Sequence, residues 1–189
     1  MAENEKQFES NIEAFLISSV GGYTKATDAG YKSSSGMALD INTLVGFVQI
    51  TQPSEWKRFE KQCNSDPYKK FYKCFEDAVQ MNGLLSVMRH GFKHRGIDFK
   101  VCCFKPESTL NTAAVERYKQ NVCQCIRQWH YSEQNNKSID MMLAINGIPV
   151  VAIELKNQLT GQTVDNAKLQ WQYDRDQREP AFWLNHRIL

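Results

Sequence analysis

Residues 138–157, SIDMMLAINGIPVVAIELKN, hold two strongly apolar runs that an Asn-Gly pair separates. Asn-Gly between two short apolar runs is the strongest local signal for a β-hairpin. Runs this apolar are typical of strands that are buried on both faces of a sheet. They nevertheless carry Asp140, Glu154 and Lys156, and a buried charge is costly unless it is paired, hydrogen-bonded or bound to a metal. The sequence therefore predicts a hairpin that carries either a structural ion pair or a functional site.

The length of the hairpin loop decides whether the two acids share a face of the sheet. A two-residue loop would turn Asp140 and Glu154 to opposite faces, because a one-residue shift in register flips a whole strand. A three-residue loop, with Gly147 as a left-handed bulge residue, would place the two acids diagonally on one face. Lys156 would share that face, since it lies two residues after Glu154 on a strand. We predict the bulged three-residue loop.

Two carboxylates on one face repel each other, and a hard cation would offset that repulsion. Oxygen ligands of this kind favour Mg²⁺ or Mn²⁺. Such an ion can lower the pKa of a bound water, and Lys156 could orient that water or neutralise charge on a phosphate. Asp140, Glu154 and Lys156 therefore suit the hydrolysis of a phosphodiester. The alternative is a surface ion pair between Glu154 and Lys156, with Asp140 as a solvated acid.

The rest of the chain predicts an α/β (α+β) fold, in which a mainly helical part, about 1–95, precedes a small sheet, about 96–189. In the first helix, expected to end before Gly21-Gly22, the apolar face is formed by residues that recur at helical spacing, Phe8, Ile12, Phe15, Leu16 and Val20. The later segments are expected as helices at 38–51, 53–64, 66–91 (capped by Asp66) and 108–120 (capped by Ser108), and as strands at 96–104, 121–132, 138–145 and 149–155. Residues 160–177 are expected as a loop followed by a helix.

Composition excludes several classes of protein. The longest apolar runs fall short of the ~18 residues that a membrane span needs, and the polar N-terminus has no signal-peptide pattern, so we expect a cytoplasmic protein. A net charge of +2 permits binding to nucleic acid without indicating it. None of the six cysteines forms a C-x-x-C pair, which predicts reduced, buried thiols in place of zinc ligands or disulfides.

The string NGIPVVAIELKNQLTGQ closely resembles the N-terminal nuclease region of the restriction (R) subunits of type I restriction–modification enzymes. The same family pattern continues upstream, in FESNIEAFLISSVGGY, LDINTLVGFVQITQPSEW, RHGFKHRGIDFKVCCFKPES and NTAAVERYKQNVCQCIRQWHYS. That family belongs to the PD-(D/E)xK nucleases. The resemblance implies a restriction-endonuclease-like fold, a mixed central sheet flanked by helices, as a single domain over 1–189.

The resemblance also implies the roles of individual residues. Asp140 and Glu154 correspond to the two metal-binding acids, and Lys156 to the motif lysine, so these three are the implied catalytic residues. The backbone carbonyl of Leu155 is implied as a further metal ligand. An acid of the first helix often joins such sites, and Glu9 is the candidate, with Glu13 one turn later as its rival. Ile139 stands where the family name has a proline.

A second group of residues is carried over with less specific motifs. Many relatives have a Gln and a Tyr on the helix after the E-x-K strand. Here the candidates are Gln170, Gln172 and Tyr173. Their spacing departs from the family's Q-x-x-x-Y pattern, and a packing role for Tyr173 stays open. The basic run RHGFKHRG offers phosphate contacts through Arg89, Lys93 and Arg95, or is a solvated loop.

The resemblance implies a type I site-specific deoxyribonuclease that uses Mg²⁺ or Mn²⁺ and acts on DNA together with methyltransferase and specificity subunits. An ATP-driven motor belongs to the R subunit, but the sequence has no G-x-x-x-x-G-K-[ST] loop. We therefore expect the 189 residues to be an N-terminal fragment, with ATP used by the part that follows. The alternatives are a non-catalytic DNA-binding or assembly module, or a repair or resolvase-type nuclease of the same superfamily.

Overall fold

The structure is a computed structural model that describes residues 5–31, 37–63, 65–132, 135–156, 163–175, 178–179, 181–182 and 187–188. The chain divides into two compact units. The first contains residues 1–39, 123–144 and 149–189, and the second contains residues 40–122 and 145–148. That all 189 residues act as one nuclease domain stays a prediction.

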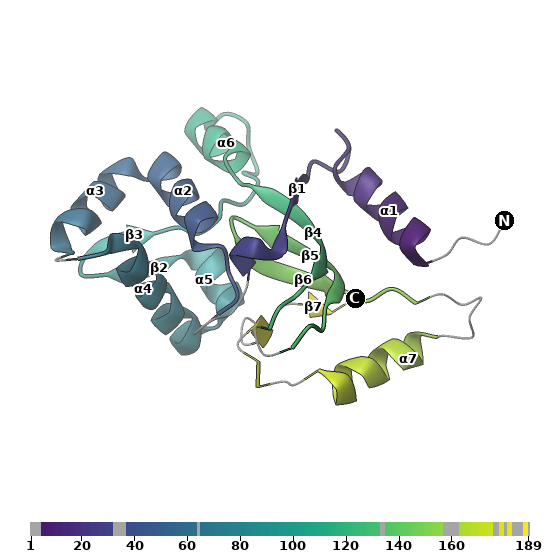
Figure 1. The fold of residues 1–189 in the computed structure, drawn as a ribbon. Coiled ribbons are helices and arrows are strands. Elements are labelled where there is room, and N and C mark those ends of the chain that lie inside the picture. Colours follow the sequence, from purple (N-terminus) through teal and green to yellow (C-terminus); the bar gives the residue numbers. More distant parts are fainter. Residues whose placement is uncertain are drawn as a thin grey trace. The chain divides into compact units, whose positions relative to one another are not determined.

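The first unit is built on a mixed sheet. Within the described residues the sheet has five strands in the order β1-β4-β5-β6-β7 (Figure 1). The strands are β1 (Thr24–Ala26), β4 (Cys123–Trp129), β5 (Ile139–Ile145), β6 (Ile148–Ile153) and β7 (Arg187–Ile188). β1 runs parallel to β4, and β6 runs parallel to β7. The α+β class and the strands predicted at 121–132, 138–145 and 149–155 are confirmed, whereas β1, too short for a hydrophobic period, was not predicted.

Both faces of this sheet are covered, which explains why β5 and β6 are so apolar. Met142 of β5 packs with Trp129 and Trp171 in the larger hydrophobic cluster. Met141, its neighbour in the chain, packs with Cys125 and Leu155 in a second cluster. Consecutive residues of a strand point to opposite faces, so the two methionines serve the two layers. The helical elements of this unit are α1 (Glu5–Leu16), η1 (Asp28–Tyr31), α7 (Val164–Leu169) and the π-helical η3 (Gln170–Asp174).

Helix α1 contacts the sheet through a different face from the one predicted. Ile12 and Leu16 pack on the second cluster, as expected, but Phe8 and Phe15 are 45% and 62% exposed. The face at positions 9, 12, 13 and 16 is turned inward, so the buried residues of the helix are Glu9 and Glu13. The predicted apolar face is wrong by about one position, and Glu9 and Glu13 on the buried face form ion pairs with Arg127 of the sheet.

The second unit packs short helices around a two-stranded ribbon, β2 (Phe92–His94) and β3 (Ile97–Phe99). Its aromatic side chains form an edge-to-face stack, in which the ring centroids of Phe71 and Phe99 lie 5.1 Å apart and those of Phe59 and Phe99 lie 5.5 Å apart. The helices are α2 (Ile41–Thr51), α3 (Pro53–Gln62), α4 (Pro67–Asn82), α5 (Leu84–His90) and α6 (Thr112–Lys119).

Several predicted boundaries in the second unit hold and three do not. Asp66 caps α4 by accepting hydrogen bonds from the backbone N–H groups of Tyr68 and Lys69, as predicted. The single helix expected at 66–91 is broken at Gly83, where φ is +77°. The strand expected at 96–104 ends at Phe99, and α6 is capped by Asn111 in place of Ser108.

None of the helices in the described part of the chain is long and apolar enough to cross a bilayer.

Candidate active site

The hairpin that carries the two acids has a two-residue turn. β5 ends at Ile145 and β6 begins at Ile148, and the residues between them, Asn146 and Gly147, both have positive φ, +52° and +79°. Positive φ at both central positions defines a type I′ turn, the form that suits the twist of two antiparallel strands. The predicted three-residue bulged loop is therefore wrong.

The surroundings of Asn146 explain why the shorter turn is preferred. The Asn146 side chain is fully buried, donates to the Val101 carbonyl at 2.9 Å and accepts from the Val122 backbone N–H at 2.7 Å. The Gly147 carbonyl accepts a hydrogen bond from the Asp40 backbone N–H, also at 2.9 Å. These contacts from distant segments fix the turn, and a pattern within the hairpin cannot reveal them.

Asp140 and Glu154 meet in spite of the even-numbered turn. β6 ends at Ile153, so Glu154 and Leu155 lie beyond the last regular residue of the strand. There the alternation of faces no longer applies, and the Leu155 backbone N–H donates to Asp140 Oδ2 at 2.6 Å. The argument that an even loop must separate the acids fails, because Glu154 and Lys156 are not on the strand.

Glu154 lies in a strongly perturbed environment. Its side chain is buried, and burial is the main reason that its pKa is raised to about 7. Arg175 opposes this increase through its positive charge, while the neighbouring carboxyl group of Asp140 adds to it. Perturbed carboxyl groups of this kind concentrate at functional sites, although structural ion pairs also produce them.

Arg175 is the cation of the site, and the sequence did not indicate it. Its guanidinium forms an ion pair with Glu154 and donates a 2.6 Å hydrogen bond to the Ser138 carbonyl. Arg175 follows η3 directly and is 5% exposed. A single arginine after a Gln/Tyr-rich helix carries no spacing signal, so only the fold brings it to Glu154.

A chain of polar contacts connects this site with α1. The Ser138 hydroxyl donates to Gln128 Oε1 at 2.9 Å, and the Gln128 amide donates to the Glu9 carboxylate at 3.4 Å. Gln128 has φ +49° although it lies within β4, an uncommon conformation for a residue with a side chain. Such strained residues are found where surrounding contacts over-determine them, often at functional sites. Gln128 was also not predicted.

The two acids of α1 are held mainly by Arg127. Its Nε donates to Glu9 Oε1 at 2.7 Å and its Nη1 to Glu13 Oε2 at 3.3 Å, while Lys25 pairs with Glu13 at 3.1 Å. In the described residues neither acid contacts Asp140 or Glu154 directly. Glu9 is linked to Ser138 through Gln128 and Glu13 is not, which favours Glu9 over its rival. Its role as a metal ligand stays a prediction.

The remaining residues predicted for this region are distributed as follows. Lys156 is half-buried, and within the described part of the chain no hydrogen bond or ion pair occupies its ammonium group. Gln170 is half-buried, Gln172 is exposed, and Tyr173 is 78% exposed. A packing role for Tyr173 is therefore wrong. Trp171, at 9% exposed, is the aromatic residue of η3 that enters the core.

The donor set fits a hard divalent cation. Among the described residues no group of three or more His, Cys, Asp or Glu side chains is arranged as a metal site. Mg²⁺ commonly binds through one or two carboxylates and keeps several of its waters. Asp140 and Glu154 are two adjacent carboxyl groups, the number of carboxylates that this mode of binding uses. Asp140 and Glu154 could hold such an ion without a third acid.

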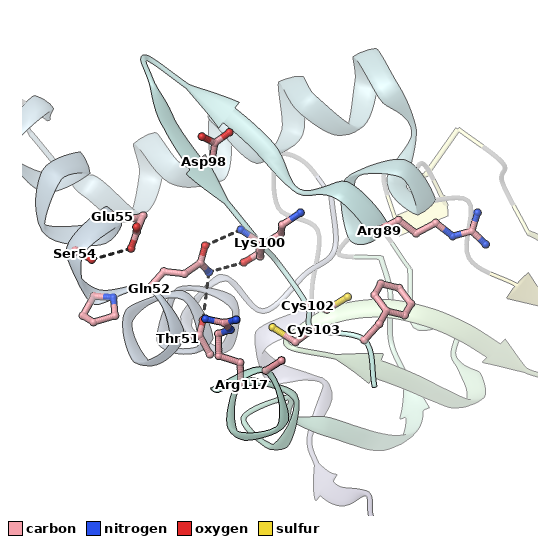
Figure 2. Close-up of a pocket in the computed structure, with 13 residues that line it drawn as sticks. Thr51, Gln52, Ser54, Glu55, Arg89, Asp98, Lys100, Cys102, Cys103 and Arg117 are labelled. Atoms are coloured by element: carbon pink, nitrogen blue, oxygen red, sulfur yellow. Dashed lines mark hydrogen bonds between the residues drawn. The ribbon is translucent and has the colours of Figure 1, made fainter. Parts of the chain in front are cut away.

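In the second unit, basic side chains line a cleft of about 610 Å³ (Figure 2). Figure 2 shows Arg117 beside Thr51 and Gln52, and Arg89 at the other end of the cleft. The Gln52 side chain is bonded to both the backbone N–H and the carbonyl of Lys100, at 2.8 Å each. This clamp fixes the chain that follows β3 to the junction of α2 and α3.

The predicted phosphate-contact residues do not form one cluster. Of the three, only Arg89 lines the cleft. Lys93 lies on β2 and pairs with Asp98 of β3 at 3.3 Å. Arg95 lies in the turn between these strands, with φ +45°. The run therefore covers the end of α5, β2 and the turn before β3, in place of a loop, and its contacts with DNA stay a prediction. Lys100 and Arg117, which line the same cleft as Arg89, were not predicted.

All six cysteines are free thiols, as predicted, but only Cys102 and Cys125 are fully buried.

The first unit thus has an α+β arrangement in which two carboxyl groups meet just beyond the end of β6, and a lysine follows two residues later in the chain. A comparison with protein families matches residues 49–187 to the family described as type I restriction enzyme R protein N terminus. The chain belongs to this family, as the sequence resemblance indicated. No curated protein and no solved structure matches it.

Proposed function

We propose that the chain is the DNA-cleaving domain of a type I restriction enzyme R protein, a metal-dependent endonuclease. The observation that supports this function is the convergence of Asp140 and Glu154 at the end of β6. Leu155 donates to Asp140 there, and Lys156 follows with its ammonium group unpaired among the described residues. The chain belongs to the R protein family, and the two acids and the lysine are the residue types that DNA cleavage requires.

In this proposal Asp140, Glu154 and the Leu155 carbonyl hold a Mg²⁺ or Mn²⁺ ion. The ion supplies Lewis acidity and a lowered pKa for a water that it binds. The Leu155 N–H fixes one oxygen of Asp140. Lys156 neutralises charge that develops on the phosphate. The DNA is delivered by an ATP-driven motor elsewhere in the R protein, and the methyltransferase and specificity subunits choose the site.

The test uses the R protein that contains this sequence, assembled with its methyltransferase and specificity subunits. Cleavage of unmodified target DNA is measured with Mg²⁺ and ATP, and translocation is measured in parallel. Asp140→Asn, Glu154→Gln and Lys156→Ala should each reduce cleavage by at least ~100-fold, the scale of losing one transition-state stabilising group, while translocation continues.

Lys168→Ala is the matched control. Lys168 lies on α7 and pairs with Asp165, and both side chains are exposed. It should cleave at the wild-type rate. Undiminished cleavage by all three site variants would overturn the proposal and would favour a non-catalytic assembly role for this region.

A further inference from the structure

The guanidinium of Arg175 lies over two aromatic rings. Its central carbon lies 5.4 Å from the ring centroid of Tyr131 and 5.8 Å from that of Trp171. Trp171 precedes it by four residues, so the π-helical η3 presents both side chains to the same region of the core. Aromatic faces attract a cation, and more strongly where water is excluded. Burial therefore leaves the plane of the guanidinium little freedom to rotate.

The two terminal nitrogens of the guanidinium have acceptors as well, whereas Nε is buried without a hydrogen-bond partner among the described residues. Nη2 contacts both Glu154 Oε1 and the Ser138 carbonyl, and Nη1 donates to the Tyr131 hydroxyl at 3.3 Å. Only the rigid planar fork of arginine can reach three acceptors in fixed directions, because a lysine ammonium is a single point on a flexible stem. Two of these acceptors, Ser138 and Tyr131, anchor the fork, and the third is the acid at the site.

Glu154 needs such an anchor. It follows the last residue of β6, so no strand pairing holds its backbone, and the neighbouring charge of Asp140 repels its carboxylate. Without a fixed cation on its far side, the side chain would turn away from Asp140.

We propose that Arg175 is a positioning residue of the nuclease site, which holds the Glu154 carboxylate beside Asp140 from a frame made by Ser138, Tyr131 and Trp171. This inference rests on the proposed function. Arg175 touches neither the phosphate nor the attacking water, and acts only through Glu154.

The test compares Arg175→Met and Arg175→Lys in the assembled enzyme. Both should retain ATP-driven translocation. Arg175→Met should reduce DNA cleavage in Mg²⁺ by about 100-fold, the scale expected when a reacting group is misplaced by about 1 Å. Arg175→Lys keeps the charge, so its melting temperature should be close to that of the wild type. Its cleavage rate should nevertheless stay below a tenth of the wild-type rate, because lysine lacks the planar fork.

Two further measurements separate positioning from a merely structural role. Ile126→Ala removes a fully buried side chain from the same core without touching the charged group, and serves as the control for lost stability. Mg²⁺ demands near-ideal octahedral geometry, so a displaced Glu154 should reduce cleavage in Mg²⁺ more than cleavage in the less demanding Mn²⁺. The ratio of Mn²⁺ to Mg²⁺ cleavage should rise at least fivefold for both Arg175 variants and stay unchanged for Ile126→Ala.

A readout without metal completes the design. In the metal-free R protein, the losses of melting temperature in Arg175→Met and Glu154→Gln should not add in the double variant, since both remove the same contact. Additive losses, or Arg175 variants whose cleavage follows melting temperature as in Ile126→Ala, would overturn the positioning role. If Asp140→Asn also cleaves normally, the proposed function itself has failed. Loss in Asp140→Asn with normal cleavage in Arg175→Lys refutes only the role of Arg175.

Discussion

Replacing Gly147 with alanine should destabilise the protein far more than the same replacement at Gly96. Both glycines follow a residue of positive φ in a tight turn, and their own φ angles are nearly equal, +79° and +77°. A left-handed conformation costs an alanine roughly 1–2 kcal/mol at either position. The two positions differ in what a new Cβ would meet, so the comparison isolates that contact.

At Gly96 a Cβ would find open space, with no atom within 4 Å. At Gly147 it would lie 2.2 Å from the Asp40 carbonyl oxygen and 3.2 Å from the Leu44 backbone nitrogen. Both atoms belong to the backbone at the start of α2 and cannot rotate away. The turn and the helix must separate, which breaks the 2.9 Å bond from the Asp40 N–H to the Gly147 carbonyl. Losing a buried hydrogen bond in this way costs a further ~1–3 kcal/mol.

The expected losses in the free energy of unfolding are therefore about 2–5 kcal/mol for Gly147→Ala and about 1–2 kcal/mol for Gly96→Ala. Urea denaturation of residues 1–189, followed by circular dichroism and tryptophan fluorescence, measures both values. Gly22→Ala, with φ +72° and nothing within 4 Å, is a second control and should resemble Gly96→Ala. Equal losses at positions 147 and 96 would refute the role assigned to the close approach of Asp40.

Two further predictions concern charges and thiols in the first unit. Arg127→Met leaves Glu9 and Glu13, whose side chains are 5% and 9% exposed, without their main cation, and should lower the free energy of unfolding by about 2–3 kcal/mol. Lys168→Met removes an exposed ion pair and should cause no measurable change in urea denaturation. Equal effects of the two substitutions would contradict the argument. Burial raises the pKa of Cys125 to about 11, so at pH 8 only about 0.1% of this thiol is ionised. Iodoacetamide followed by mass spectrometry should therefore label Cys63 before Cys125, and fast labelling of Cys125 in the native protein would refute its burial.

The sequence predicted the elements whose signal is local. The strands at 138–145 and 149–155 were found because apolar runs flank an Asn-Gly turn, and the cap at Asp66 because Pro67 follows it. The break at Gly83 was missed, since an isolated glycine is tolerated within many helices. β1 has three residues and exists only because β4 pairs with it.

The candidate site was predicted correctly only in part, for physical reasons. The hairpin and the family resemblance predicted that Asp140 and Glu154 lie close together, and the structure brings them together. The geometric reason given for it was wrong, because regular strand pairing ends at Ile153. Arg175 and Gln128 could not be found, because their contacts span 21 and 119 positions of the chain respectively.

The end of β6 also answers why a chain would place charges in two apolar runs. Within a strand buried on both faces, an acid would need a partner on one fixed side of the sheet. One residue past the strand, the backbone is released from pairing, and Glu154 can approach Asp140 while Arg175 approaches from the core. The apolar runs then hold the strand end in place, Asp140 stays on β5, and Glu154 meets it where strand geometry no longer dictates direction. A shift of the strand end by one residue, and not a change in loop length, is therefore the perturbation that would dismantle this site.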